Sequence, residues 1–130
     1  RRDLVKHFMT SSALAVAGGG AVSNAIGLRK EMDDASSVSG FSFIDLAADR
    51  AGVHFAERAL ASAASASALQ DRLAKGRGST RLMTDIRGLE ENLSKEAFER
   101  RYGGPGDQRY EQVVGMIDQR INNLVLYRQD

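Results

Sequence analysis

Residues 41–56 read FSFIDLAADRAGVHFA and combine a helix start with charged residues in an apolar setting. Ser42 is a residue type that caps helices, and Asp45, three residues later, resembles the acidic partner of a capping box. Asp45 and Asp49 are four residues apart and therefore share one face of the predicted helix. A buried carboxylate is costly unless it has a partner, a cation or a task. The stretch thus predicts a helix that brings two acidic side chains to one candidate site.

The rest of the chain has a helical character almost throughout. It contains one proline, lacks alternation of β-branched residues, and uses Ala, Leu, Glu, Arg and Gln in its long segments. We expect a first helix over about 3–17 and a second that ends near 34. The triplet Gly18-Gly19-Gly20 between them either breaks the helix or lets another backbone come close. Residues 35–40 (ASSVSG) have the composition of a loop.

The C-terminal part of the chain predicts further helices. The helix that Ser42 caps is expected to run to about Lys75, through the Ala/Ser tract 61–68, which suits close helix contact. Ser79 or Thr80 could cap another helix, and Ser94 could cap the next.

A final amphipathic helix is predicted over 107–128. The preceding GGPG at 103–106 is a strong turn, and Asp107 can cap the helix that follows it. Its apolar positions recur at helical spacing and predict a face that packs against the core. These positions are Tyr110, Val113, Val114, Ile117, Ile121, Leu124 and Val125.

These patterns together predict an all-α fold. We expect one compact helical bundle of four to six helices over 1–130, with the polar motif in 1–57. The first three helical segments would form the core, and the C-terminal helix would close it.

Composition excludes several function classes. A chain of 130 residues suits one domain, and a net charge of +1 argues against a nucleic-acid-binding surface. Because the sequence has no cysteine, it cannot form a disulfide framework, a thiolate zinc site or a cysteine nucleophile. That absence fits the cytoplasm as well as the periplasm. The sequence starts Arg1-Arg2-Asp3 without a methionine, so we expect a processed protein or a fragment.

Residues 11–28 carry no charge, which raises the question of a membrane span. Four glycines, three serines and an asparagine dilute the apolarity of this run. A spanning helix needs roughly 20 predominantly apolar residues. We therefore expect a closely packed helix and no membrane span.

The charged residues of the N-terminal half offer three kinds of chemistry. Glu31 and Asp34 share a helix face, so with Asp45, Asp49 and His7 they could form one polar site. We expect no cofactor, but if a divalent metal is bound, Asp34 and Asp45 are its candidate ligands. Alternatively, two carboxylates could act on a glycosidic bond, or His7 could be a general base oriented by an aspartate.

Structural roles compete with each of these interpretations. Asp45 could serve only as a helix cap, and Asp34 could lie on a solvated helix face. His7 near a helix start could be a structural histidine.

Three segments resemble the YfiM-like family of small predicted bacterial periplasmic lipoproteins. They are DLVKHF at 3–8, GLRKEMDDA at 27–35 and SGFSFIDLAADRAG at 39–52, less than half of the chain. The matching positions are His7, Phe8, Gly27, Lys30, Glu31, Asp34, Ser42, Asp45, Asp49 and Gly52. The resemblance implies a place in the bacterial periplasm or cell envelope, without a defined mechanism. The sequence departs from the family in having no cysteine to accept a lipid.

Two functions follow as hypotheses. In the first, the chain is a non-catalytic structural or protein-interaction module with a buried His/Glu/Asp cluster, and an envelope protein or cell-wall component is its partner. In the second, it is a small hydrolase acting on a cell-wall or membrane component. Its catalytic residues would be His7, Glu31 and Asp49, with His7 and Glu31 as the acid and base. We favour the first and leave the oligomeric state open.

Overall fold

A computed structural model describes residues 2–37, 40–76 and 82–128. Within these ranges the chain forms six α-helices and one short 3-10 helix, which confirms the predicted all-α bundle. The helices are α1 (Arg2–Gly18), α2 (Gly20–Ala35), α3 (Phe43–Leu60), α4 (Ala63–Lys75), α5 (Lys95–Tyr102), α6 (Gln108–Asn122) and the 3-10 helix η1 (Val125–Tyr127).

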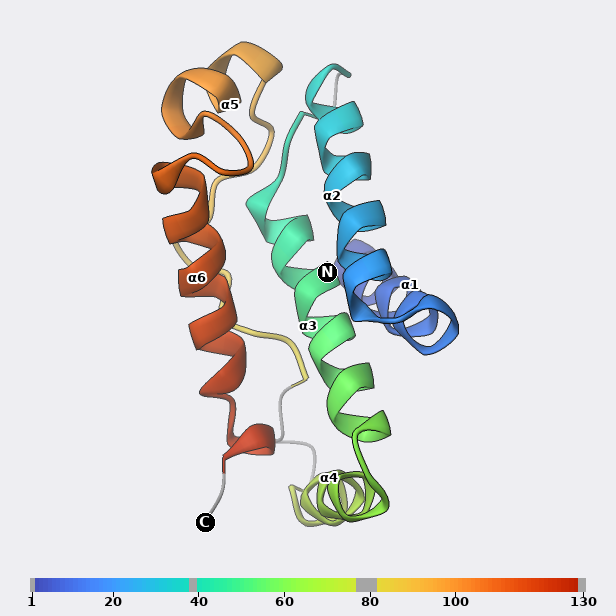
Figure 1. Cartoon of the computed structure of the whole chain (residues 1–130). Helices are drawn as coiled ribbons and strands as arrows, with labels where there is room; N and C mark the ends of the chain where they lie inside the picture. The colour runs from blue at the N-terminus through green and yellow to red at the C-terminus, as the bar shows by residue number, and fades with distance from the viewer. Residues whose placement is uncertain (1, 38–39, 77–81, 129–130) are drawn as a thin grey trace.

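Helix α3 lies at the centre of the molecule (Figure 1), where it contacts α1, α2, α4 and α6. Helices α1 and α2 cover one side of it, and α6 covers the other. The centre of α3 consists of small residues: Ala47, Ala48 and Ala51 are all completely buried. Because these side chains are short, the neighbouring helices can approach the α3 backbone closely. The sequence FIDLAADRAGVHFA thus provides the packing surface on which the other helices assemble.

The glycine triplet separates α1 from α2. Gly19 has a φ of 90°, a backbone conformation that residues other than glycine rarely adopt. Of the two alternatives for the triplet, the helix break is therefore correct. The break lets α2 turn back over α3, which brings the acidic end of α2 toward the start of α3 (Figure 1).

The single helix expected over 42–75 is wrong, because the chain bends at Ser62. This residue has an extended backbone, and its side-chain oxygen accepts a hydrogen bond from the N–H of Ser65. Ser62 therefore acts as the N-cap of a separate helix, α4. Helix α4 points in a different direction from α3 (Figure 1).

The helix expected after Ser79 or Thr80 is also absent from the described residues that follow. Ser79 and Thr80 themselves lie outside the described ranges, and 82–94 contain no helix. Instead, Leu93 pairs with Phe41 through an isolated antiparallel bridge. Gly88 and Asn92 both have positive φ values, which are incompatible with a continuous helix.

The final helix starts where expected but ends earlier. Asp107 caps α6 by accepting a hydrogen bond from the N–H of Arg109, and α6 ends at Asn122 and not near 128. Leu124 is extended, and the chain then forms η1. This change of direction buries Leu126 and leaves Val125 67% exposed, so Val125 does not belong to the core face. None of the helices in the described ranges combines the length and apolarity that a membrane crossing requires.

Candidate functional site

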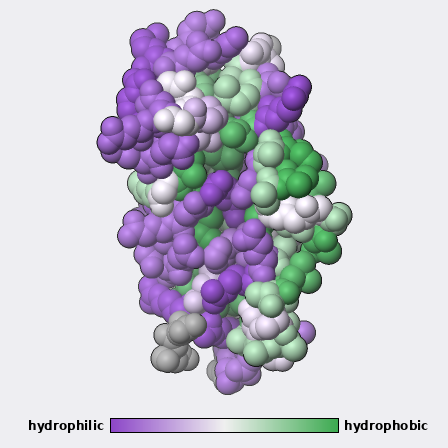
Figure 2. All heavy atoms as spheres, viewed as in Figure 1, coloured by the Kyte–Doolittle hydropathy of each residue, from purple (hydrophilic) through white to green (hydrophobic). Residues whose placement is uncertain are grey.

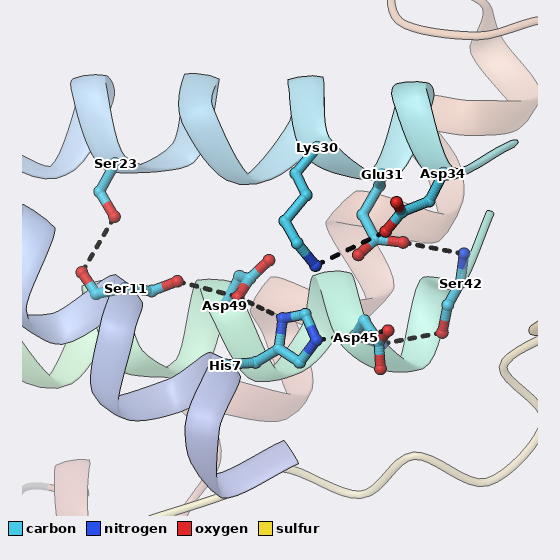
Figure 3. Close-up of polar contacts among 9 residues, drawn as sticks. All are labelled: His7, Ser11, Ser23, Lys30, Glu31, Asp34, Ser42, Asp45 and Asp49. Atoms are coloured by element: carbon cyan, nitrogen blue, oxygen red, sulfur yellow. Dashed lines mark hydrogen bonds and ion pairs between the residues drawn. The ribbon is translucent and has the colours of Figure 1, made fainter. Parts of the chain in front are cut away.

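The polar residues of the N-terminal half meet between three helices. His7 comes from α1, Glu31 from α2, and Asp45 and Asp49 from α3 (Figure 3). Helix α1 presents His7 to α3, and Gly52 makes the close approach possible. A Cβ atom at Gly52 would collide with the carbonyl oxygen of Phe8. We call His7, Glu31, Asp45 and Asp49 the polar cluster.

His7 contacts two carboxylates at once. Its Nδ1 atom lies 3.0 Å from Oδ1 of Asp49, and its Nε2 atom lies 3.4 Å from Oδ2 of Asp45. Both aspartates are on one face of α3, as their spacing of four residues predicted. These two contacts raise the pKa of His7 to about 10, with the hydrogen bond to Asp45 as the largest cause and the one to Asp49 next. The imidazole is therefore a cation at neutral pH and holds α1 against α3.

Glu31 is the most deeply buried member of the cluster, with 0% of its surface exposed. Its Oε2 atom accepts a hydrogen bond from the backbone N–H of Ser42 at 3.1 Å. Burial raises the pKa of Glu31 to about 7, although the bond from Ser42 opposes this rise. Its other oxygen, Oε1, has no hydrogen-bond partner among the described residues.

The contact between Glu31 and Ser42 corrects the predicted capping box. Ser42 does cap α3, because its side-chain oxygen accepts from the N–H of Asp45. The reciprocal bond to the N–H of Ser42, however, comes from Glu31 of α2. Asp45 is thereby left to contact His7. Among the described residues the Asp45 carboxylate makes no capping hydrogen bond, so the interpretation of Asp45 as a helix cap alone is wrong.

Two serines that were not predicted as site residues extend the hydrogen bonds of the cluster. The hydroxyl of Ser11 donates to Oδ1 of Asp49 at 2.9 Å. The hydroxyl of Ser23 donates in turn to the carbonyl oxygen of Ser11. Both residues are almost completely buried. The available signal was position: Ser11 follows His7 by four residues and therefore shares its helix face.

Asp34 is the predicted site residue that the structure does not bring into the cluster. It forms an ion pair with Lys30 on its own helix, with 3.5 Å between Nζ and Oδ2. Figure 3 shows this pair beside Glu31. Asp34 follows Glu31 by three residues, but its side chain is one-third exposed while that of Glu31 is sealed. Glu31 and Asp34 share a helix face as predicted, but Glu31 lies on the core side of that face and Asp34 lies at its solvent-exposed edge.

A groove between α1 and α2 lies next to the cluster and has a volume of ≈ 310 Å³. His7, Ser11 and Asp49 form part of its wall, and Lys6 and Lys30 also line it. Glu31 is not among the lining residues. Solvent thus reaches one side of the His7–Asp49 pair through the groove.

Comparison with models of known protein families gives no match for this chain. Comparisons with curated proteins and with solved structures give no match either.

Proposed function

We propose that this chain is a non-catalytic helical module of the bacterial envelope that binds another envelope protein. In this proposal, the polar cluster holds α1 and α2 in a fixed register on α3. The outer faces of α1 and α2 then form the binding surface. The assignment to the envelope rests on the resemblance of residues 3–52 to the YfiM-like family.

The observation that carries the proposal is that His7 is paired through both ring nitrogens and that Glu31 is sealed from solvent. Both ring nitrogens of His7 contact carboxylates, so neither offers a lone pair to a substrate. A general base must reach the proton that it removes, and Glu31 is completely buried. A buried ionic group with this arrangement can specify how helices pack, because any other register would leave charges unpaired.

The outer faces of α1 and α2 support the interaction part of the proposal. Large apolar side chains are about half exposed or more on both helices, and 8–28 contain no charged residue. Figure 2 shows hydrophobic side chains gathered on the side where Figure 1 places α1 and α2. These side chains are Val5, Met9, Val16, Val22 and Ile26. Contiguous exposed apolar surface often marks a protein-interaction site.

Hydrogen exchange of the backbone amides tests the structural role. In His7→Gln, the amides of α1 should exchange at least about tenfold faster than in the wild type, while those of α6 change much less. His54→Gln is the matched control, because His54 lies on α3 but contacts Tyr127 and not the cluster. Unchanged protection of α1 in His7→Gln would contradict the proposal.

The groove beside His7 and Asp49 favours one second candidate, the small hydrolase. A substrate in the groove would reach Asp49, and release of His7 from Asp45 would provide a base. Chromogenic esters, phosphoesters and glycosides, together with purified cell-wall fragments, test this candidate. Turnover that is lost in both His7→Gln and Glu31→Gln would establish the hydrolase and overturn the non-catalytic proposal.

A further inference from the structure

We propose that His7, Glu31 and Asp49 bind one divalent cation, with Zn²⁺ preferred over Mg²⁺ and Ca²⁺. This inference rests on the proposed function, because it makes the cation part of the same link between α1, α2 and α3. It assigns the metal to a different set of ligands from the pair Asp34 and Asp45 that the sequence suggested.

The distances within the cluster suit a single ion. One ligand atom from each of the three residues lies within 4.8 Å of the other two. A point central to three such atoms is at most about 2.8 Å from each of them, whereas zinc bonds to nitrogen and oxygen are ~2.0–2.2 Å long. Small rotations of the side chains therefore suffice to complete the coordination. The 3.0 Å between His7 and Asp49 already fits two ligands of one ion.

A buried oxygen without a partner is the independent observation that points to a ligand. Oε1 of Glu31 has no hydrogen-bond partner among the described residues, although Glu31 is completely buried. Such an atom carries a desolvation cost that a cation would offset. Figure 3 shows the Glu31 carboxylate facing the side of the cluster where His7 and Asp49 lie.

Each proposed ligand is also held by a second polar contact. Ser42 donates its N–H to the other oxygen of Glu31, and Ser11 donates its hydroxyl to Asp49. Binding of Zn²⁺ would release the proton from Nδ1 of His7, so that Nδ1 binds the ion while Nε2–H donates to Asp45. Metal-binding histidines usually donate their second ring N–H in this way, and such contacts fix the orientation of the ligands.

The ligand types select the cation. One imidazole and two carboxylates form a mixed nitrogen and oxygen set, which suits Zn²⁺. Ca²⁺ takes six to eight oxygen ligands, and Mg²⁺ retains several of its waters in near-octahedral geometry. The groove provides a path for the ion to the His7–Asp49 side of the cluster. Lys30 also lines this groove, and its ammonium group is paired with Asp34, which is not a proposed ligand.

Calorimetric titration of the chelator-treated protein with zinc chloride tests the site. We expect one equivalent of Zn²⁺ to bind, with binding at least about tenfold weaker in Glu31→Gln and in Ser11→Ala. Asp33→Asn is the matched control and should bind Zn²⁺ as the wild type does, since Asp33 is exposed on the same helix and lies outside the ligand set. Circular dichroism verifies that each variant is folded. The absence of binding, or equal binding in the wild type and Glu31→Gln, would overturn the metal site.

Hydrogen exchange in the presence of chelator separates this inference from the proposed function. If zinc does not bind but His7→Gln still loses protection in α1, the metal site is wrong and the structural role stands. If His7→Gln keeps full protection in α1, the structural role is wrong, and the titration alone decides the metal site.

Discussion

The imidazole of His7 lies 3.0 Å from the carboxylate of Asp49, which is 42 residues further along the chain. This contact joins the first helix to the central helix, next to the hydrogen bonds from Ser11 to Asp49 and from Ser12 to Gly52. It depends on two glycines that permit close approach. Gly52 leaves room for the backbone of α1 at Phe8, and a Cβ atom at Gly27 would lie 3.0 Å from Oδ2 of Asp49. The position of the cluster is therefore set by backbone packing as well as by charge.

The stability of the metal-free protein should fall as the pH rises. The pKa of His7 is about 10 in the folded protein against 6.5 in the unfolded chain. Its contribution is therefore complete below pH 6.5 and is lost as the pH rises toward 10. The pKa of Glu31 is about 7 when folded against 4.5 when unfolded, so Glu31 also lowers stability as the pH rises between these values.

Urea unfolding in chelator across pH 5–10 measures this dependence, in buffers of matched ionic strength. His7→Gln should have a flatter profile than the wild type above pH 6.5. A wild-type stability that rises over the alkaline part of this range would contradict the assignment of His7 as a half-buried cation paired with two carboxylates.

Gly52→Ala should destabilise the protein by about 2 kcal/mol or more, because the added methyl group collides with the backbone of Phe8. Gly115→Ala is the matched control. Gly115 also lies in a helix, but a Cβ atom there would meet no other atom within 4 Å. The control should be stabilised by up to ~1 kcal/mol through its helix propensity. Thermal unfolding of both variants is the measurement, and equal shifts would argue against the close α1–α3 contact.

Ser62→Ala should cost about 1 kcal/mol, because it removes the side-chain oxygen that caps α4. Ser67→Ala, at an exposed position inside the same helix, should have no such cost, since alanine favours helix interiors. Chemical denaturation of the two variants compares them directly. If both substitutions had the same effect, Ser62 would not be a cap, and the single helix expected from the sequence would regain support.

Local chemistry in the sequence predicted the helix starts at Ser42, Ser94 and Asp107. In each case the structure shows a side-chain oxygen that accepts a backbone N–H two or three residues later. Ser62 has the same chemistry but lies in an Ala/Ser tract, where several serines are equivalent by sequence. The choice of Ser62 as the cap depends on how α4 packs against α3 and η1, which local sequence does not specify.

Local sequence patterns also predicted part of the polar cluster. Periodicity placed Asp45 and Asp49 on one face of α3, and the cost of burying charge indicated that they need a partner. Which acidic residue of α2 points inward was not predictable, because Glu31 and Asp34 are neighbours on the helix surface. The angle at which α2 crosses α3 decides that Glu31 meets Ser42.

A double-mutant cycle between His7 and Asp49 tests the central claim, that these residues act as one structural link between α1 and α3. Urea unfolding would be measured in chelator near pH 7 for the wild type, His7→Gln, Asp49→Asn and the double variant. Loss of one partner leaves His7 with Asp45 alone, or Asp49 with Ser11 alone, so each single change should cost up to about 3 kcal/mol. The account predicts a coupling energy of at least ~1 kcal/mol, so the double variant should lose less than the two single losses added together. Additive effects within ~0.3 kcal/mol would contradict it.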